Sequence, residues 1–520
     1  MYVLKYFYYI YLISFTEIYA SNSNIKTTVQ NTSEQLTLVN IFCSKMKKAQ
    51  LVFIPFPGLS HLVSTLELAK LLINRDNRLR ITVLLMNFSR SKETDLYIKS
   101  LPISDSLNFI KLPECFVPPN TNPRAVFDAL LEAQKPNVRQ AVSDLINVER
   151  QGPLASFVID MFCTPMIDIA KEFSVPTLVF LTSGVACLGV NFHIHTLRER
   201  DNVDPTQLLQ QTEFAIPTFA NLVPSYSLPS SVISKEWESL FMNFVRGLKN
   251  ADGLIINSFE ELESHAVHSF SSHPELAGLP IIYPVGPILT PEPKSKSVVE
   301  PDDIIKWLDD QPPSSVVFFC FGTSGSFDED QVKEIAHAIE NSGARFVWSL
   351  RKPQLKGVAP SDYSLSDLSL VLPEGFLDRT RGIGRVIGWA PQTQILAHPA
   401  TGGFVSHCGW NSTLESIYFG VPIATWPIYA EQQTNAFELV VELKLAVEIA
   451  LDYKVEFKGG PNYLLTADKI EGGIRNVLDK DGEVRKKVKK MSEKSRTTLL
   501  EGGSSYTYLG RLIDYIMNQI

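Results

Sequence analysis

The sequence has few cysteines and no excess of basic residues. Its six cysteines are scattered over 520 residues, and no two form a C-x-x-C pair. This pattern favours reduced, buried thiols over a disulfide framework or a zinc site. The 48 Lys and Arg against 56 Asp and Glu give a net charge of −8, which argues against a nucleic-acid-binding protein. With 45% hydrophobic residues, the composition excludes bulk disorder, a collagen-like fibre and a polytopic membrane protein.

Several motifs with a known chemistry are also missing. No G-x-G-x-x-G follows a strand pattern and no G-x-x-x-x-G-K-[ST] occurs, which argues against a dinucleotide oxidoreductase and a P-loop ATPase. The sequence has no G-x-S-x-G or H-E-x-x-H motif either. His193 and His195 are two residues apart on a predicted helix, so they face different ways and are poor candidates for a shared metal site. The acids at 328–330 suit the first turn of a helix better than a metal site. We therefore expect no metal.

The N-terminal segment allows two interpretations. Residues 2–15 are almost wholly apolar, but the run is shorter than the roughly 20 residues of a membrane helix. It is either a signal-peptide core, with Ala20 before the cleavage site, or a translated extension without a role in the fold. Two glycosylation acceptors, at 87–89 and 411–413, count against secretion, because a glycan at the second would block the ligand site predicted below. We expect a cytoplasmic protein without stable membrane insertion whose fold begins near Met46.

From residue 51 onward, buried strand patterns alternate with helical patterns, which predicts parallel sheets covered on both faces. The segment 289–301 is rich in Pro, Lys and Ser and reads as a linker between two such series. We therefore predict an α/β fold of two Rossmann-like lobes that face a cleft. The predicted parts are an extension (1–45), an N-terminal acceptor-binding lobe (46–288), the linker (289–301), a C-terminal donor-binding lobe (302–500) and a C-terminal helix that packs back on the N-terminal lobe (501–520).

The most informative stretch is 389–432, which reads as strand, glycine turn and helix start. Asn411 and Ser412 fall where the first helical turn leaves backbone N–H groups free, and such groups bind phosphate oxygens. Glu415 lies one helical turn after Asn411 and can accept hydrogen bonds from ribose hydroxyls. Trp389 offers a flat face to a base, and residues 431–432 offer polar groups to sugar hydroxyls. Together these residues describe a site for a nucleotide sugar.

This stretch resembles the signature box of the plant secondary-product UDP-glycosyltransferases, and the resemblance extends from about Met46 to the C-terminus. It implies the two-lobed GT-B fold, with UDP-glucose held mainly by the C-terminal lobe. It also implies a set of donor-binding residues: Thr182, Thr323, Trp389, Ala390, Gln392, His407, Trp410, Asn411, Ser412, Glu415, Glu431 and Gln432. The loop 322–326 departs from the family pattern of Gly-Ser-Met-Gly-Ser, because it carries Thr323 and Ser324. We expect this departure to alter packing or affinity without abolishing donor binding.

His61 and Asp160 are the predicted catalytic pair. His61 follows the first predicted strand, and ligands of open α/β sheets bind at such strand ends. A lone histidine in a loop is often a bystander, but Asp160 ends another apolar strand and needs a partner there. The simplest partner is His61, and the resemblance implies the same pair. His61 would then remove the proton from an acceptor hydroxyl, which attacks the sugar with inversion.

The expected activity is transfer of glucose from UDP-glucose to a hydroxyl or carboxyl group of a hydrophobic plant small molecule. A flavonoid or other phenolic is the first expectation for this acceptor, and a triterpenoid or an apocarotenoid or hormone acid is the alternative. A non-catalytic nucleotide-sugar or hormone-binding protein would lack His61 or Asp160. A phenolic acyltransferase would need H-x-x-x-D, and no histidine has Asp four residues later. We further expect a monomer. By the same resemblance, Gln432 and Trp410 indicate a preference for UDP-glucose over UDP-galactose and UDP-glucuronate.

Overall fold

The computed structural model describes residues 48–87, 97–101, 104–117, 126–147, 152–210, 212–289, 301–353, 361–454 and 463–520. Residues Ala49–Ile520 form one compact unit. The predictions for 1–45, Met46 and nearly all of the linker 289–301 lie outside the described residues, as do Cys43 and part of the acceptor at 87–89. Within the described ranges, no helix combines the length and the apolar character needed to cross a membrane.

The N-terminal lobe is built on a seven-stranded sheet in the order β3-β2-β1-β4-β5-β8-β9, and every neighbouring pair is parallel. The strands are β1 (Ala49–Ile54), β2 (Leu79–Asn87), β3 (Leu107–Glu114), β4 (Leu154–Asp160), β5 (Thr177–Leu181), β8 (Gly253–Ile256) and β9 (Ile281–Pro284). Side chains of β1 alternate between two cores, since Leu51 and Phe53 lie in one and Val52 and Ile54 in the other. The sheet is therefore buried on both faces, as its continuous apolar strands predict.

The C-terminal lobe contains a second parallel sheet of six strands in the order β12-β11-β10-β13-β14-β15. The strands are β10 (Val316–Cys320), β11 (Arg345–Ser349), β12 (Gly384–Ile387), β13 (Thr401–Ser406), β14 (Ile423–Thr425) and β15 (Ala446–Glu448). Here too alternate side chains enter different cores, with Phe318 on one face and Phe319 on the other. Both strand orders belong to the doubly wound type, which confirms the predicted fold class.

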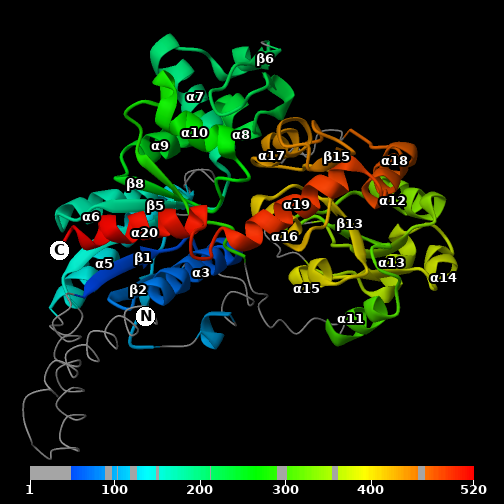
Figure 1. Ribbon diagram of the computed structural model, residues 1–520, viewed down its shortest axis with the longest axis horizontal. Coiled ribbons are helices and arrows are strands. Elements are labelled where there is room, and N and C mark those ends of the chain that lie inside the picture. Colours follow the sequence, from blue (N-terminus) through cyan, green and yellow to red (C-terminus); the bar gives the residue numbers. More distant parts are fainter. Residues whose placement is uncertain are drawn as a thin grey trace, which may run out of the picture. The chain divides into compact units, whose positions relative to one another are not determined.

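Helices cover both faces of each sheet (Figure 1). Those of the N-terminal lobe are α3 (Leu59–Arg75), α5 (Val126–Ile146), α6 (Ile167–Glu172), α7 (Val185–Asp201), α8 (Ser230–Ile233), α9 (Glu238–Lys249) and α10 (Ser264–Ser272). Those that follow are α11 (Pro301–Asp309), α12 (Glu329–Ser342), α13 (Leu365–Val371), α14 (Phe376–Thr380), α15 (Gln392–Ala397), α16 (Trp410–Phe419), α17 (Gln432–Phe437), α18 (Ala467–Leu478), α19 (Glu483–Thr497) and α20 (Ser504–Met517). A short antiparallel pair, β6 (Glu213–Phe214) and β7 (Val223–Pro224), lies outside both sheets.

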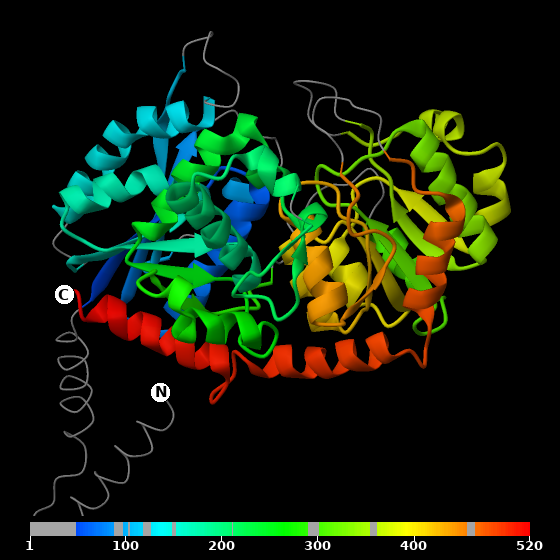
Figure 2. The same ribbon diagram turned by 90° about the horizontal axis from the view of Figure 1, so that it is seen from above.

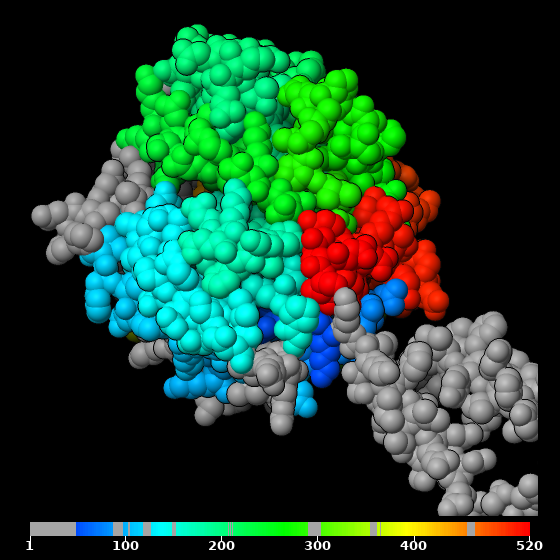
Figure 3. Space-filling view, turned by 90° about the vertical axis from the view of Figure 1, so that its left-hand side faces the viewer, coloured from blue at the N-terminus to red at the C-terminus, as the bar shows by residue number. Residues whose placement is uncertain are grey.

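The last two helices connect the lobes. Helix α19 packs against α16, and α20 packs against β9 and shares the core of the first sheet through Leu509, Leu512 and Ile516. Figure 2 shows the two helices following one another along one side of the unit. In Figure 3 the red surface of α20 lies beside the cyan and green segments of the N-terminal lobe. The chain thus returns to its first lobe, while the limits 46–288 and 302–500 stay predictions.

Several local expectations agree with the structure. Asp328 caps α12 through the backbone N–H of Gln331, which confirms the structural interpretation of the acids at 328–330. The five cysteines of the described part are free, and all but Cys115 are buried. His193 and His195 lie on α7, as predicted, and this helix ends at Asp201, with Asn202 after it in a left-handed conformation. Buried side chains such as Phe192 and Ile194 hold this part of α7 in the core.

Candidate active site

The predicted catalytic pair lies where the order of the first sheet reverses. His61 lies in the first turns of α3, directly after β1, and Asp160 ends β4, which is the strand paired with β1. Nδ1 of His61 and Oδ2 of Asp160 are 2.8 Å apart. The other carboxylate oxygen of Asp160 accepts a hydrogen bond of 2.9 Å from the backbone N–H of Phe162. Asp160 is fully buried, whereas the His61 side chain keeps 20% of its surface exposed. Asp160 therefore orients the imidazole through Nδ1, and part of the ring stays accessible to a ligand.

Charge around His61 sets its affinity for protons. Burial lowers the pKa of His61, but the Asp160 carboxylate, through its charge and hydrogen bond, and then Glu431 raise it. The net result is a pKa above the ordinary value of 6.5. Glu431 follows β14 of the other lobe, so a carboxylate of that lobe contributes to the raised pKa of His61.

Phenylalanine side chains surround His61. The ring centroids of Phe56 and Phe162 each lie 5.2 Å from that of His61. Phe127 and Phe244 extend the cluster, with centroids 4.8 Å from Phe56 and 5.9 Å from Phe162, respectively. Phe162 is 39% exposed, so part of its ring is open to a ligand. The space next to the base is thus bordered by apolar, aromatic surface.

A pocket opens beside this pair, and both lobes line it. The N-terminal lobe contributes the start of α3, where Ser60 precedes His61. The C-terminal lobe contributes seven of the predicted donor-binding residues: Thr323, Trp389, Ala390, Gln392, Asn411, Ser412 and Glu415. These residues follow β10, β12 and β13, so the pocket lies at the carboxyl ends of parallel strands and at the reversal between β10 and β13.

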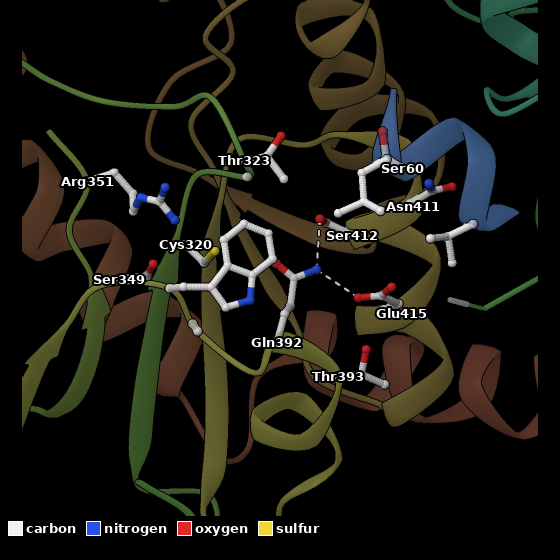
Figure 4. A pocket seen from close by; sticks show the side chains of 15 residues that line it. Ser60, Cys320, Thr323, Ser349, Arg351, Gln392, Thr393, Asn411, Ser412 and Glu415 are labelled. Atoms are coloured by element: carbon white, nitrogen blue, oxygen red, sulfur yellow. Dashed lines mark hydrogen bonds between the residues drawn. The ribbon is translucent and has the colours of Figure 1, made fainter. Parts of the chain in front are cut away.

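The N-terminus of α16 forms one wall of this pocket. Gly409 caps the helix, and the backbone N–H of Thr413 is the first to bond within it, to Gly409. The N–H groups of residues 410–412 therefore have no partner inside the helix and are suited to phosphate oxygens. Gln392, the first residue of α15, donates from Nε2 to two side chains of α16, Ser412 Oγ at 2.9 Å and Glu415 Oε2 at 2.7 Å (Figure 4). Gln392 thus fixes the orientation of the Glu415 carboxylate.

Trp389 also lines the pocket. The guanidinium of Arg351 lies 5.4 Å from the centroid of the Trp389 ring. Arg351 in turn lies 3.2 Å from the Asp362 carboxylate, and only 11% of its side chain is exposed. The indole is therefore held by a paired cation, and both residues line the pocket. A planar base can stack on such a surface.

His407 is packed between two glycines near the end of β13. A Cβ on Gly322 or Gly409 would lie 2.6 Å or 2.5 Å from Nε2 of His407, so a larger residue at either position would displace the imidazole. Burial lowers the pKa of His407 to about 4, so the ring is neutral at pH 7. Its Nδ1 atom is buried without a hydrogen-bond partner among the described residues. An unsatisfied buried nitrogen beside free helix N–H groups fits a ligand that accepts hydrogen bonds.

Some predicted donor-binding residues are not part of the pocket wall. The Trp410 side chain is 2% exposed, and its Nε1 donates to the backbone oxygen of Asn257 at 2.7 Å. The indole therefore packs in the core, and a role of Trp410 in donor binding stays a prediction. Gln432 is 3% exposed and its Oε1 accepts from the backbone N–H groups of Ile428 and Tyr429, so it braces the turn that carries Glu431. The Thr182 hydroxyl contacts the sulfur of Met161, with 3.9 Å between Oγ1 and Sδ.

Other pocket residues were missed in the sequence. Cys320 and Ser349 end β10 and β11, Arg351 follows β11, and Ser60 precedes His61. The rule that ligands bind at the carboxyl ends of strands would have found the first three, because both strands are apolar runs in the sequence. The loop residue Ser324, which departs from the family pattern, interacts with the hydroxyl of Tyr429.

The chain is similar to known sugar-transferring proteins. Residues 300–452 match the family described as UDP-glucoronosyl and UDP-glucosyl transferase. A UDP-glucose flavonoid 3-O-glucosyltransferase 6 from Fragaria ananassa is 50% identical over 487 residues, which cover 91% of this chain and 99% of that protein. The UDP-glycosyltransferase 71A15 from Malus domestica is 50% identical over 485 residues, covering 90% of this chain and all of that one.

Solved structures give the same result. A transferase from Siraitia grosvenorii in complex with UDP has a TM-score of 0.80 and 46% identity, and the match covers 90% of this chain and 100% of that one. UGT71G1 from Medicago truncatula, complexed with UDP-glucose, has a TM-score of 0.78 and 39% identity over 90% of this chain and 98% of that one. Because the identity is this high over nearly whole chains, the similarity shows a shared family as well as a shared fold.

Proposed function

Because the chain belongs to the UDP-glycosyltransferase family, we propose that it is an inverting O-glucosyltransferase that uses UDP-glucose and a flavonoid or related phenolic acceptor. The observation that carries the proposal is the place of the His61–Asp160 pair, 2.8 Å apart, next to Ser60, which lines the same pocket as the α16 N-terminus. A base and a phosphate-binding helix end thus border the same space. Named relatives include flavonoid glucosyltransferases, which supports the acceptor class.

The base acts on the acceptor hydroxyl. In its neutral form, His61 takes the proton while Asp160 holds the ring through Nδ1 and stabilises the imidazolium that forms. The acceptor oxygen attacks the anomeric carbon from the side opposite to UDP, so the carbon–oxygen bond to the nucleotide breaks as the new one forms and configuration inverts. A nearby carboxylate such as Glu431 further favours the charged imidazolium.

The departing diphosphate gains negative charge during this step. Free N–H groups at residues 410–412 and the positive end of the α16 dipole stabilise that charge. The neutral imidazole of His407 and the hydroxyl of Thr323 add hydrogen bonds without adding charge. We propose that these groups make a metal ion dispensable. Within the described residues, no cluster of three or more His, Cys, Asp or Glu is arranged to hold a metal.

The acceptor class follows from the surface next to His61. Rings of Phe56, Phe127, Phe162 and Phe244 border the base, and a flat phenolic can bury its faces against them. Burial of the acceptor's apolar surface contributes about 25 cal/mol per Å² to binding. The acceptor hydroxyl that contacts His61 fixes the orientation of the acceptor. A flavonoid meets both requirements with one molecule.

An acceptor panel tests the proposal. The purified full chain is incubated with UDP-glucose and pairs of phenolics that differ by methylation of one hydroxyl, and products are identified by mass spectrometry and by the anomeric configuration. We expect β-glucosides of the free phenols and none at the methylated position. His61→Ala serves as the control, since it should bind UDP but transfer glucose far more slowly. UDP binding without transfer to any panel member would favour a non-catalytic nucleotide-sugar-binding protein.

We also infer a monomeric enzyme of the cytoplasm. Asn411, which begins a glycosylation triplet, lines the donor pocket and hydrogen-bonds with buried neighbours. A glycan on its amide would break these bonds and fill the pocket, so the site is compatible with a compartment that lacks N-glycosylation. Sedimentation and localisation of a tagged full chain test the two inferences.

A further inference from the structure

The side chain of Asn411 joins the two lobes. Its Nδ2 donates to Oγ of Ser64 in α3 at 3.1 Å. Its Oδ1 accepts from Nδ2 of Asn257 at 3.4 Å, in the segment that follows β8. Ser64 and Asn257 belong to the N-terminal lobe and both are fully buried. The amide of Asn411 is therefore satisfied by protein groups, although this residue lines the donor pocket.

Asn257 is anchored independently of Asn411. Its Oδ1 accepts from the backbone N–H of Ile288 at 2.7 Å, and its Nδ2 also donates to the Ile288 oxygen at 3.1 Å. Its backbone oxygen accepts from the Trp410 indole at 2.7 Å. Asn257 thus holds two consecutive residues of α16, one through the main chain and one through the side chain. Such a fixed amide can serve as a reference point for the start of α16.

Ser64 provides the link to the base. It lies three residues after His61 on α3, so both side chains are on neighbouring turns of one rigid helix. Asn411 is the second residue of α16, directly before Ser412 and one turn before Glu415. A single hydrogen bond therefore ties the helix that carries the base to the helix end that faces the diphosphate.

We propose that Ser64 and Asn257 are positioning residues for glucosyl transfer, which hold the Asn411 amide and thereby fix the distance between the base and the donor. This inference rests on the proposed function. UDP itself is held by groups of the C-terminal lobe, such as Trp389, Gln392 and Glu415, which need neither Ser64 nor Asn257. Transfer requires both lobes in register, because a misplacement of about 1 Å can cost roughly 100-fold in rate.

The neighbouring residue of Ser64 offers a matched control. Thr65 is also fully buried in α3, but its hydroxyl has no hydrogen-bond partner among the described residues. Ser64→Ala should lower kcat about tenfold, near the worth of one hydrogen bond, while the Kd for UDP measured by calorimetry stays within twofold. Thr65→Val removes a buried hydroxyl from the same turn and should leave kcat unchanged. Counting active sites by UDP titration corrects kcat for misfolded protein.

A double-mutant cycle separates positioning from general destabilisation. In an Asn411→Ala background, Ser64→Ala should cause less than a twofold further loss of kcat, because its partner is already gone. The proposal is overturned if Ser64→Ala keeps full kcat, if Thr65→Val is equally slow, if UDP affinity falls as much as kcat, or if the two losses multiply. A parent chain without any glucosyl transfer would instead defeat the proposed function, so the two failures differ.

Discussion

Glu415 is the donor-site carboxylate whose contribution can be measured most directly. It is 4% exposed, lines the pocket and receives a hydrogen bond of 2.7 Å from Gln392, which fixes its orientation. We expect this carboxylate to accept hydrogen bonds from the ribose hydroxyls of UDP. Glu415→Ala removes the acceptor and leaves the α16 N-terminus in place.

The size of the effect follows from the charge. A hydrogen bond to an ionised group contributes about 1.5–3 kcal/mol, so the loss of one such bond weakens binding roughly 10- to 150-fold. The KM for UDP-glucose and the Kd for UDP should rise together, because both ligands carry the ribose. Stacking on Trp389 and the phosphate contacts at residues 410–412 remain, and binding should therefore stay measurable.

Calorimetry with UDP and 2′,3′-dideoxy-UDP tests the assignment. Parent enzyme should bind UDP more tightly than the dideoxy analogue, whereas Glu415→Ala should bind the two almost equally. Gln392→Ala is an informative control, since it frees the carboxylate from its partner and should weaken UDP binding less. If Glu415→Ala lowers affinity for both ligands by the same factor, or leaves UDP affinity unchanged, the ribose role is refuted.

Three further predictions concern the base, the sugar and the metal. His61→Ala should lower kcat by roughly 10²–10⁴-fold with little change in UDP affinity. Asp160 raises the pKa of His61, and the neutral base is lost below that pKa. Asp160→Asn should therefore move the acidic limb of kcat/KM to lower pH. An unmoved limb in a pH-rate profile would contradict this. UDP-glucose should be preferred over UDP-galactose and UDP-glucuronate, and Gln432→Ala should cut activity and narrow that preference, since Gln432 braces the turn that carries Glu431. Equal kcat/KM for the parent with UDP-galactose would defeat this account of the sugar site. Activity should persist in EDTA because the α16 N-terminus carries the phosphate contacts, and a strict need for added metal would overturn that explanation.

Residues at the ends of strands were predictable from the sequence. His61, Asp160 and the segment 389–415 follow apolar strand patterns, and parallel sheets place such ends at one edge. The helix start at residues 410–412 was predictable as well, because a glycine turn after a strand precedes it. Local sequence therefore predicted about half of the residues that line the pocket, including the start of α16.

Contacts between distant segments were not predictable in this way. The Trp410 indole is buried, and its N–H group is satisfied by the backbone oxygen of Asn257, 153 residues away. Arg351 gave no local signal, since its value to the site arises from stacking on Trp389 and pairing with Asp362. Such partners depend on how the strands are ordered and on how the lobes meet, and neither is encoded in a short motif.

The pair Glu431 and His61 shows what such a contact does to the chemistry. Burial raises the pKa of the Glu431 carboxyl, and His61 opposes this, while Glu431 in turn raises the pKa of His61. Sugar hydroxyls that donate to Glu431 favour its ionised form, so bound donor should make His61 a stronger base. The acidic limb of kcat, which reports the bound enzyme, should then lie at higher pH than that of kcat/KM. Glu431→Gln should move both limbs to lower pH and remove their separation, and a separation that survives this substitution would show that the donor acts on His61 by another route.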